Sequence, residues 1–338
     1  MRILAVLACA ALPASMGWGA GFGSTARGTT TGEFLELGVG GRAIAMGEAY
    51  TAVTSGADSL YWNPAGLTRI ESRDATFMHA AYLGSSSYDY AAYGQRAGES
   101  GVVGLGLQYF SAGSLAQTDE TGTDLGNFNP YDLAASVGYA YTFEGERLVF
   151  LQDWSAGMAG KYIKSKILSS AQTAAVDLGV LSPVYLNGKL RVGFSAANMG
   201  GKLKYDEESE ALPMTFKLGG AYQLGEKWLG SLDAGFPKDD RPFVAVGTEY
   251  WLVASGPWRL AGRAGFNSKT VGSPEGLTGA SFGIGLVYGG ASMDYAFAPM
   301  GALGMTHRIS LSFKWSAGGQ AKPDLNIEAP EHPILLLK

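Results

Sequence analysis

A serine, an aspartate and a histidine occur in the chain order of one class of hydrolase triad. Ser281 lies within Gly279-Ala-Ser-Phe-Gly283, which matches the G-x-S-x-G pattern of a nucleophile elbow, and Asp294 and His307 follow it. A serine nucleophile of this kind requires a sharp strand-to-helix turn that exposes its hydroxyl. Here the pattern lies inside an alternating, strand-like segment with no helix after it, in a chain rich in glycine and serine. We therefore attribute the match to chance and predict no catalytic residues and no enzymatic activity.

The residues that usually hold metals and cofactors do not form a recognisable group either. His79, His307 and His332 have no metal-ligand spacing, and Cys9 is the only cysteine. The formal net charge is −5, with no Lys/Arg cluster, whereas nucleic-acid binding favours a basic patch. We expect no metal, no cofactor and no nucleic-acid partner.

The elements around these residues alternate with a period of two, which residues 131–143 illustrate. One face is large and apolar: Tyr131, Leu133, Ala135, Val137, Tyr139, Tyr141 and Phe143. The other is small and polar: Asp132, Ala134, Ser136, Gly138, Ala140 and Thr142. A helix would scatter both sets around its circumference, so the pattern indicates a strand.

About fourteen such segments follow one another, most of them 9 to 13 residues long. They lie near 74–83, 86–97, 101–111, 131–143, 154–166, 172–180, 189–198, 214–224, 226–235, 242–252, 257–266, 279–289, 290–298 and 306–315. Their length suits tilted membrane strands of roughly 9–11 residues. Aromatic residues near strand ends are typical of interfacial girdles, and we assign Tyr109, Phe110, Tyr141, Phe143, Trp251, Trp258 and Trp315 to them. We predict an all-β, antiparallel transmembrane barrel of about fourteen strands.

Composition and the N-terminus favour the membrane over a soluble β-sandwich. Only 16% of the residues are charged, below the roughly 25% of soluble domains. Arg2, an apolar stretch at 3–12 and small residues up to Ala20 predict an export signal, too short to cross about 30 Å of hydrocarbon. We assign residues 1–20 to a signal peptide, 21–72 to an N-terminal lumen plug, 73–315 to the barrel and 316–338 to a flexible periplasmic tail.

The segment before the first strand is rich in small residues and contains a short predicted helix within 41–50. Asp58 could cap a turn that Asn63-Pro64 ends, since Pro64 disfavours helix at Asn63. Such a segment ahead of a barrel is a natural lumen plug, although it could also be only a lead-in to the first strand. Inside a barrel Arg42 should meet a carboxylate, because a buried unpaired charge is costly.

Residues 40–67 resemble the PorV/PorQ family of outer-membrane proteins, relatives of the FadL fatty-acid transporters. The pattern G-x-R-A-x-x-M-G-x-A-x-T-A-V begins at Gly40, and L-Y-W-N-P-A-G-L ends at Leu67. The plug-motif residues are Arg42, Met46, Gly47, Asn63, Pro64 and Ala65. The resemblance implies a fourteen-stranded barrel in the outer membrane of a Gram-negative bacterium, surrounded by outer-membrane lipids. Some members of the family bind the C-terminal signals of proteins exported by type IX secretion.

We favour secretion-linked binding of exported proteins or other secretion components, because the resemblance is closer to PorV/PorQ than to FadL. FadL-like transport of hydrophobic molecules is the alternative, and a purely structural or adhesive role stays open. An apolar pocket would favour transport, and its candidate lining is Met46, Tyr50, Leu60, Tyr61 and Trp62. Residues 112–130 and 199–213 are long connections that would suit protein binding. Polar residues expected to face the lumen are Asp132, Ser136, Lys161, Arg191, Lys217, Arg259, Arg263 and Asp294. We expect most of these to pair with one another rather than with a ligand.

Overall fold

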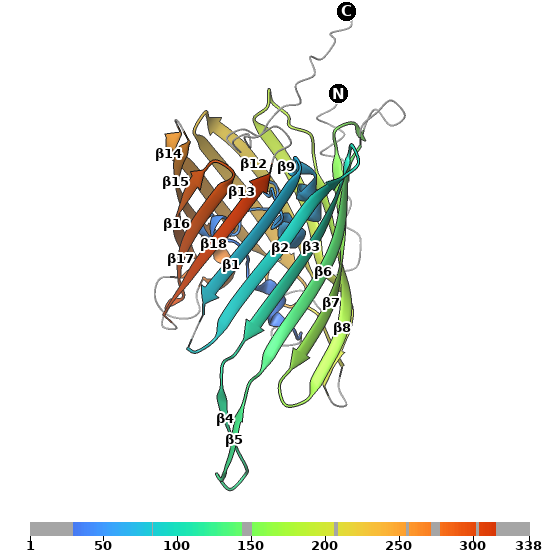
Figure 1. Cartoon of the computed structure of the whole chain (residues 1–338), viewed down its shortest axis with the longest axis vertical. Helices are drawn as coiled ribbons and strands as arrows, with labels where there is room; N and C mark the ends of the chain where they lie inside the picture. Colours follow the sequence, from blue (N-terminus) through green and yellow to red (C-terminus); the bar gives the residue numbers. More distant parts are fainter. Residues whose placement is uncertain are drawn as a thin grey trace, which may run out of the picture.

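The computed structural model describes residues 30–315, apart from 83, 144–150, 206–208, 255–256, 272–277 and 302–303. Its main body is a closed antiparallel barrel of fourteen strands around an N-terminal plug (Figure 1). The predicted signal peptide and tail lie outside the described residues. Among the described residues, no helix is long and apolar enough to cross a membrane.

Every alternating segment expected from the sequence is a barrel strand, which confirms the predicted fold. The strands are β1 (Arg73–Ala81), β2 (Ser87–Ala97), β3 (Gly101–Ser111), β6 (Tyr131–Thr142), β7 (Ser155–Lys166), β8 (Ser170–Leu181), β9 (Leu190–Gly200), β12 (Thr215–Gly225), β13 (Trp228–Pro237), β14 (Phe243–Ala254), β15 (Trp258–Asn267), β16 (Ala280–Tyr288), β17 (Ala291–Pro299) and β18 (Met305–Trp315). Each pairs with its predecessor, and β1 pairs with β18 to close the wall. Closure removes the free sheet edges that a bilayer would leave unsatisfied.

The two ends of the barrel differ. Short turns such as 226–227 and 289–290 lie at one end, which we call the turn end. The two longest connections, 112–130 and 201–214, lie at the opposite end, the loop end, where the hairpin of β4 (Leu115–Thr118) and β5 (Asp124–Phe128) projects beyond the wall (Figure 1). A second small hairpin there pairs β10 (Lys202–Lys204) with β11 (Ser209–Ala211). The sequence pattern did not predict these short hairpins, which fall in the two long connections.

The wall separates the two faces as the alternation predicted. Val137 is 60% exposed on the outside, whereas Ala134 and Ala140 of the same strand are 0% exposed on the inside. The prediction that Trp251 and Phe110 belong to the interfacial girdles is wrong, because both side chains point inward. Trp251 is 6% exposed with the Arg259 guanidinium 5.1 Å from its ring centroid, and Phe110 packs against the interior core. The period of two decides the face of each residue, and proximity to a strand end does not.

The plug fills the interior as a series of short helical turns (Figure 1). These are η2 (Glu33–Glu36), α2 (Gly41–Ala45), α3 (Ser59–Trp62) and η3 (Pro64–Arg69). Ile44, Tyr50 and Trp62 of the plug share one hydrophobic cluster with Tyr88 and Tyr90 of the wall. Each fully buried apolar side chain stabilises the folded chain by roughly 1.5–3 kcal/mol. The plug and the barrel therefore form one packed unit, rather than a strand with a loose lead-in.

Candidate functional site: the plug and its seat

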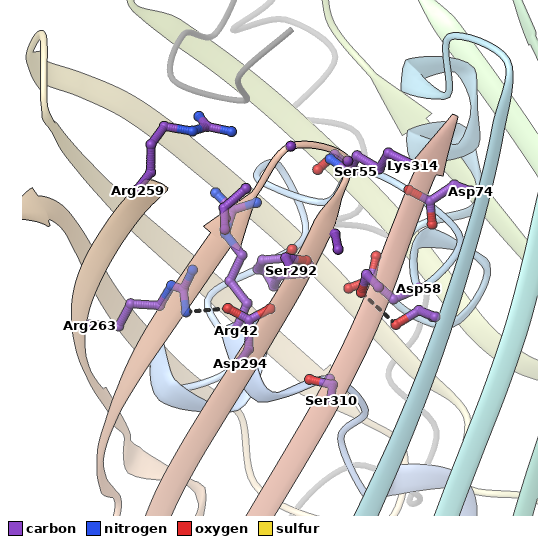
Figure 2. A pocket seen from close by; sticks show the side chains of 18 of the residues that line it. Arg42, Ser55, Asp58, Asp74, Arg259, Arg263, Ser292, Asp294, Ser310 and Lys314 are labelled. Atoms are coloured by element: carbon purple, nitrogen blue, oxygen red, sulfur yellow. Dashed lines mark hydrogen bonds and ion pairs between the residues drawn. The ribbon is translucent and has the colours of Figure 1, made fainter. Parts of the chain in front are cut away.

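A chain of four buried charges fixes the plug to the wall. Arg42 of α2 donates two hydrogen bonds to Glu249 of β14, at 2.8 and 2.7 Å. Glu249 also accepts from Arg263 Nε at 2.6 Å, and Arg263 Nη1 donates to Asp294 at 2.7 Å (Figure 2). The side chains of Glu249 and Arg263 are 1% and 2% exposed, so water screens these pairs little. The expected lumen carboxylate for Arg42 is Glu249, which the sequence analysis did not single out.

The helix α2 comes this close to the wall because the plug carries glycines at the points of contact. The backbone N–H of Gly41 donates to Ser310 Oγ at 2.7 Å, and a Cβ at Gly41 would lie 2.8 Å from the Asp294 carbonyl. Gly47 has φ +64°, and a Cβ there would lie 2.5 Å from the Phe266 nitrogen. A left-handed backbone in contact with another backbone excludes other residues. This is the physical reason for the glycine in the Met46-Gly47 pair of the motif.

The Asn63-Pro64-Ala65 motif is seated in the opposite part of the wall. Asn63 is fully buried, and its amide donates to the carbonyls of Thr51 in the plug (3.0 Å) and Val180 in β8 (3.1 Å). Its Oδ1 accepts from the Ala65 N–H at 3.2 Å, which caps η3. Asn63 thus meets its hydrogen-bonding needs by joining plug to barrel.

Two wall glycines make room for this motif. A Cβ at Gly157 of β7 would overlap the Pro64 backbone, and one at Gly179 of β8 would overlap Asn63 Oδ1. Neither glycine was predicted from the sequence to contact the plug. A useful signal would have been that glycine in a strand interior often marks close approach of another backbone.

A second wall carboxylate, Asp233 of β13, was also missed. Its Oδ2 accepts from the backbone N–H groups of Tyr50 (3.0 Å) and Thr51 (2.9 Å). Asp233 is 1% exposed, so it satisfies two N–H groups that the plug could not offer to water. Both missed anchors, Asp233 and Glu249, are acidic residues inside barrel strands. Acidic residues in such positions belong on the lumen face because the outer face meets lipid.

All eight polar residues assigned to the lumen lie on the inner side of their strands. They are Asp132, Ser136, Lys161, Arg191, Lys217, Arg259, Arg263 and Asp294. Lys161 pairs with Asp177 at 2.6 Å, and Lys217 Nζ lies 4.7 Å from the Trp62 ring centroid. Asp132 accepts from Ser165, a neighbour on the inner wall. These contacts match the expectation of internal pairing, and any role in binding stays a prediction.

The three triad-like residues do not form a catalytic group. Ser281 faces the plug, where its hydroxyl accepts from the Gly47 N–H at 3.1 Å. Asp294 is occupied by Arg263, and His307 is on the outer side of β18, with Nδ1 2.7 Å from the Tyr295 hydroxyl. A nucleophile and its base must lie within hydrogen-bond reach, and here the wall separates them.

A small polar cavity lies beside the plug at the turn end, with a volume of about 80 Å³. Figure 2 shows Arg42, Arg263, Asp58 and Asp74 among the residues that line it. The side chain of Asp58 makes no capping hydrogen bond, which corrects the prediction that it caps a turn. Burial, and then the nearby Asp74 carboxylate, raises the pKa of Asp58 to about 7. The volume suits a few water molecules at roughly 30 Å³ each.

The residues expected to line an apolar pocket are packed instead. Met46, Tyr50, Leu60 and Trp62 are 0–3% exposed, and Tyr61 donates to the Leu35 carbonyl at 3.1 Å. A much larger cavity of about 610 Å³ lies at the loop end, between the plug and β13–β18. Its lining combines five carboxylates with apolar residues such as Leu37, Ile44 and Met300.

Solved structures with a similar fold include two toluene transporters and a FadL homologue. The toluene transporter TodX of Pseudomonas putida aligns with a TM-score of 0.55 and 11% identity over 81% of this chain and 96% of its own. The toluene transporter TbuX of Ralstonia pickettii gives 0.51 and 13% identity over 82% and 98%. A FadL homologue of Pseudomonas aeruginosa gives 0.51 and 11% over 82% and 98%. At these identities the likeness shows the fold alone.

Comparison of the sequence itself gives the family. No curated protein sequence matches the chain. The family model "Type IX secretion system protein PorV" matches residues 24–226, more than half of the chain and all of the plug and its motif. The same family was expected from the residues of the plug, and FadL-related barrels are its structural neighbours. The chain therefore belongs to the PorV family of outer-membrane β-barrels.

Proposed function

We propose that this protein lies in the outer membrane of a Gram-negative bacterium and binds exported proteins at its loop end, as part of a type IX-like secretion pathway. We further propose that it has no catalytic role. Short turns usually face the periplasm and longer loops the exterior, so the loop end would be extracellular. Membership of the PorV family supports the proposal.

The observation that carries the proposal is the locked plug. Charges hold α2 through Glu249, hydrogen bonds hold Asn63 through Val180, and the apolar plug residues are packed. Breaking a buried charge pair by removing one partner costs about 3–5 kcal/mol, so such a plug would rarely open. A protein whose lumen is closed this way is better suited to binding at its surface than to conducting molecules.

The β4–β5 hairpin offers that surface. Leu115 and Leu125 are 41% and 56% exposed on it. Its turn is ordered by Asp119, whose carboxylate accepts from the Thr121 N–H (2.9 Å) and the Thr123 N–H (2.8 Å). Exposed apolar anchors within a polar rim are typical of protein-binding patches. An ordered hairpin also loses less conformational freedom on binding than a flexible loop does.

The test is a pull-down of exported proteins with the purified barrel. Leu115→Ser combined with Leu125→Ser should reduce recovery of the partner about ten-fold, since an interface anchor contributes more than about 1 kcal/mol. Leu186→Ser is the matched control, because Leu186 is 55% exposed but lies at the turn end. Equal loss in both variants, or no loss in either, would count against binding at the hairpin.

The second candidate is transport of hydrophobic molecules, which the shared fold with the toluene transporters favours. Titration of the same preparation with oleate and toluene distinguishes the two. Micromolar binding of either compound, with no protein recovered in the pull-down, would reject the secretion proposal and favour transport. Recovery of an exported protein, with no binding of oleate or toluene, would reject transport and favour the secretion proposal.

A further inference from the structure

The loop-end cavity contains a buried arginine that has no ionic partner among the described residues. Arg308 of β18 is 5% exposed and lines the cavity. Its Nη1 donates to Thr306 Oγ1 at 3.2 Å, and its guanidinium lies 5.7 Å from the Tyr82 ring centroid. Its Nε has no hydrogen-bond partner, and no carboxylate of the described residues lies within ion-pair distance.

This situation differs from that of the other buried arginine at the plug. Arg263 reaches Glu249 and Asp294, at 2.6 and 2.7 Å. A buried cation without a partner is costly, and a guanidinium is shaped to hold a carboxylate by two parallel hydrogen bonds. Arg308 lines the cavity, so a ligand that enters the cavity meets its guanidinium group.

The rest of the lining is acidic. It contributes Glu33, Glu36, Glu48, Asp239 and Asp240, against Lys269 and Arg308. Glu36 is neutralised by Lys269 at 2.5 Å, and Thr30 Oγ1 lies 2.6 Å from a Glu33 oxygen and 2.5 Å from an Asp239 oxygen. A simple anion entering this cavity would be repelled by the excess negative charge.

Glu48 is a lining carboxylate that can receive a cation. No lysine or arginine of the described residues forms an ion pair with it, and it accepts from the Asn267 amide only at 3.5 Å. Its backbone has φ +66°, an uncommon value for a residue other than glycine. Among the described residues, the cavity thus holds one cation without an ion-pair partner, Arg308, and Glu48 is one of its carboxylates without one. Its volume of about 610 Å³ is typical of small-ligand sites.

We propose that the loop-end cavity binds a ligand that carries a carboxylate and a cationic group, with the carboxylate on Arg308 and the cationic group on Glu48. Free basic amino acids and chain termini that end in lysine or arginine share this chemistry. The site goes beyond the proposed binding at the β4–β5 hairpin and does not depend on it, because it shares no residue with the hairpin.

Isothermal titration of the full chain in detergent with the tripeptide glycyl-glycyl-lysine tests the site. We expect one tripeptide per barrel, with at least about ten-fold weaker binding of its C-terminal amide and of octanoate, since a hydrogen bond to a charged group contributes that much. If free lysine binds as tightly as the tripeptide, the cavity is a site for free amino acids. If the tripeptide binds more tightly, the cavity is a site for a chain terminus. No saturable binding, or octanoate binding as tightly as the tripeptide, would overturn the proposal.

Variants assign the site. Arg308→Met should weaken tripeptide binding at least about ten-fold, whereas Arg308→Lys should retain part of the affinity. Glu48→Gln should weaken binding of the tripeptide and leave that of octanoate unchanged or improved. Arg73→Met is the matched control, because Arg73 is exposed at the turn end. Heat-modifiable gel mobility shows whether Arg308→Met is folded, and unchanged affinity in the folded variant would overturn the assignment. If Arg308→Met does not fold, unchanged affinity in both Arg308→Lys and Glu48→Gln would overturn it.

Discussion

Glu249 accepts hydrogen bonds from two arginines, so replacing its charge should loosen the plug. Glu249→Gln removes the carboxylate that pairs with both Arg42 and Arg263, and Arg263 keeps its pair with Asp294. Removing one partner of a buried ion pair costs about 3–5 kcal/mol. The Arg42 side chain is 15% exposed and can recruit some water, so we expect the lower end, about 3 kcal/mol.

The balance of charges in the group of Arg42, Glu249, Arg263 and Asp294 leads to a second expectation. The native group has two cations and two anions, Glu249→Gln leaves an excess cation, and Arg42→Met leaves an excess anion. The double variant restores balance, because Arg263 and Asp294 remain as a pair at 2.7 Å. The double variant should therefore lose at least about 1 kcal/mol less than the sum of the two single variants.

Plug opening can be measured by thiol labelling. Cys9 is the only cysteine of the chain and lies in the predicted signal, so a cysteine in place of the buried Ser59 would be a single reporter within the plug. The urea dependence of its labelling rate gives the free energy of opening in each background. Glu36→Gln is the comparison, because its pair with Lys269 is less buried, at 15% and 27% exposed, and its loss should cost less than that of Glu249.

An opening free energy of Glu249→Gln within about 0.5 kcal/mol of the parent would refute the electrostatic lock, since that is the spread of ordinary surface substitutions. Strict additivity in the double variant would refute the argument from charge balance. Loss of heat-modifiable mobility in Glu249→Gln would instead mean that the pair is needed for barrel assembly itself.

Three further predictions concern the wall, the plug and pH. Val137→Arg places a charge in lipid at a cost of roughly 2–4 kcal/mol and should reduce the folded band on a heat-modifiable gel, whereas Ser136→Arg on the inner face should be milder; equal tolerance would contradict the face assignment. Deleting residues 30–67 should raise single-channel conductance in planar bilayers, and an unchanged conductance would mean that the segment does not close the lumen. Asp58 belongs to the plug rather than to a membrane-crossing strand, and its raised pKa of about 7 means that folding favours its protonated form. The stability lost by burying the ionised Asp58 carboxylate is zero below about pH 4 and reaches its full value above about pH 7. Asp58→Asn should therefore raise the unfolding temperature at pH 8 and leave it unchanged at pH 4.

The strands and their faces were predictable because strand alternation is a local property. Val137 is outside and Ala134 inside whatever the rest of the barrel does, since successive side chains point to opposite sides of a sheet. The turn at Gly289-Gly290 follows in the same way from its residues. The same local rule, applied strictly, would also have placed Trp251 inside, on the face of Glu249.

The need for a partner of Arg42 was likewise predictable, but its identity was not. Glu249 is 207 positions away, and alternation alone leaves every inward carboxylate as a candidate. The choice depends on which strands face α2, and this depends on barrel closure and on the glycines that let α2 approach β15–β18.

The fit of Asn63-Pro64-Ala65 against Gly157 and Gly179 is likewise a property of the closed barrel. So is the lack of an ion-pair partner for Arg308 among the described residues. They depend on distances between segments far apart in the chain. Local sequence determines the conformation and face of each element, whereas only the packed structure brings these charges and backbones together, because contacts across the lumen form once all fourteen strands have paired.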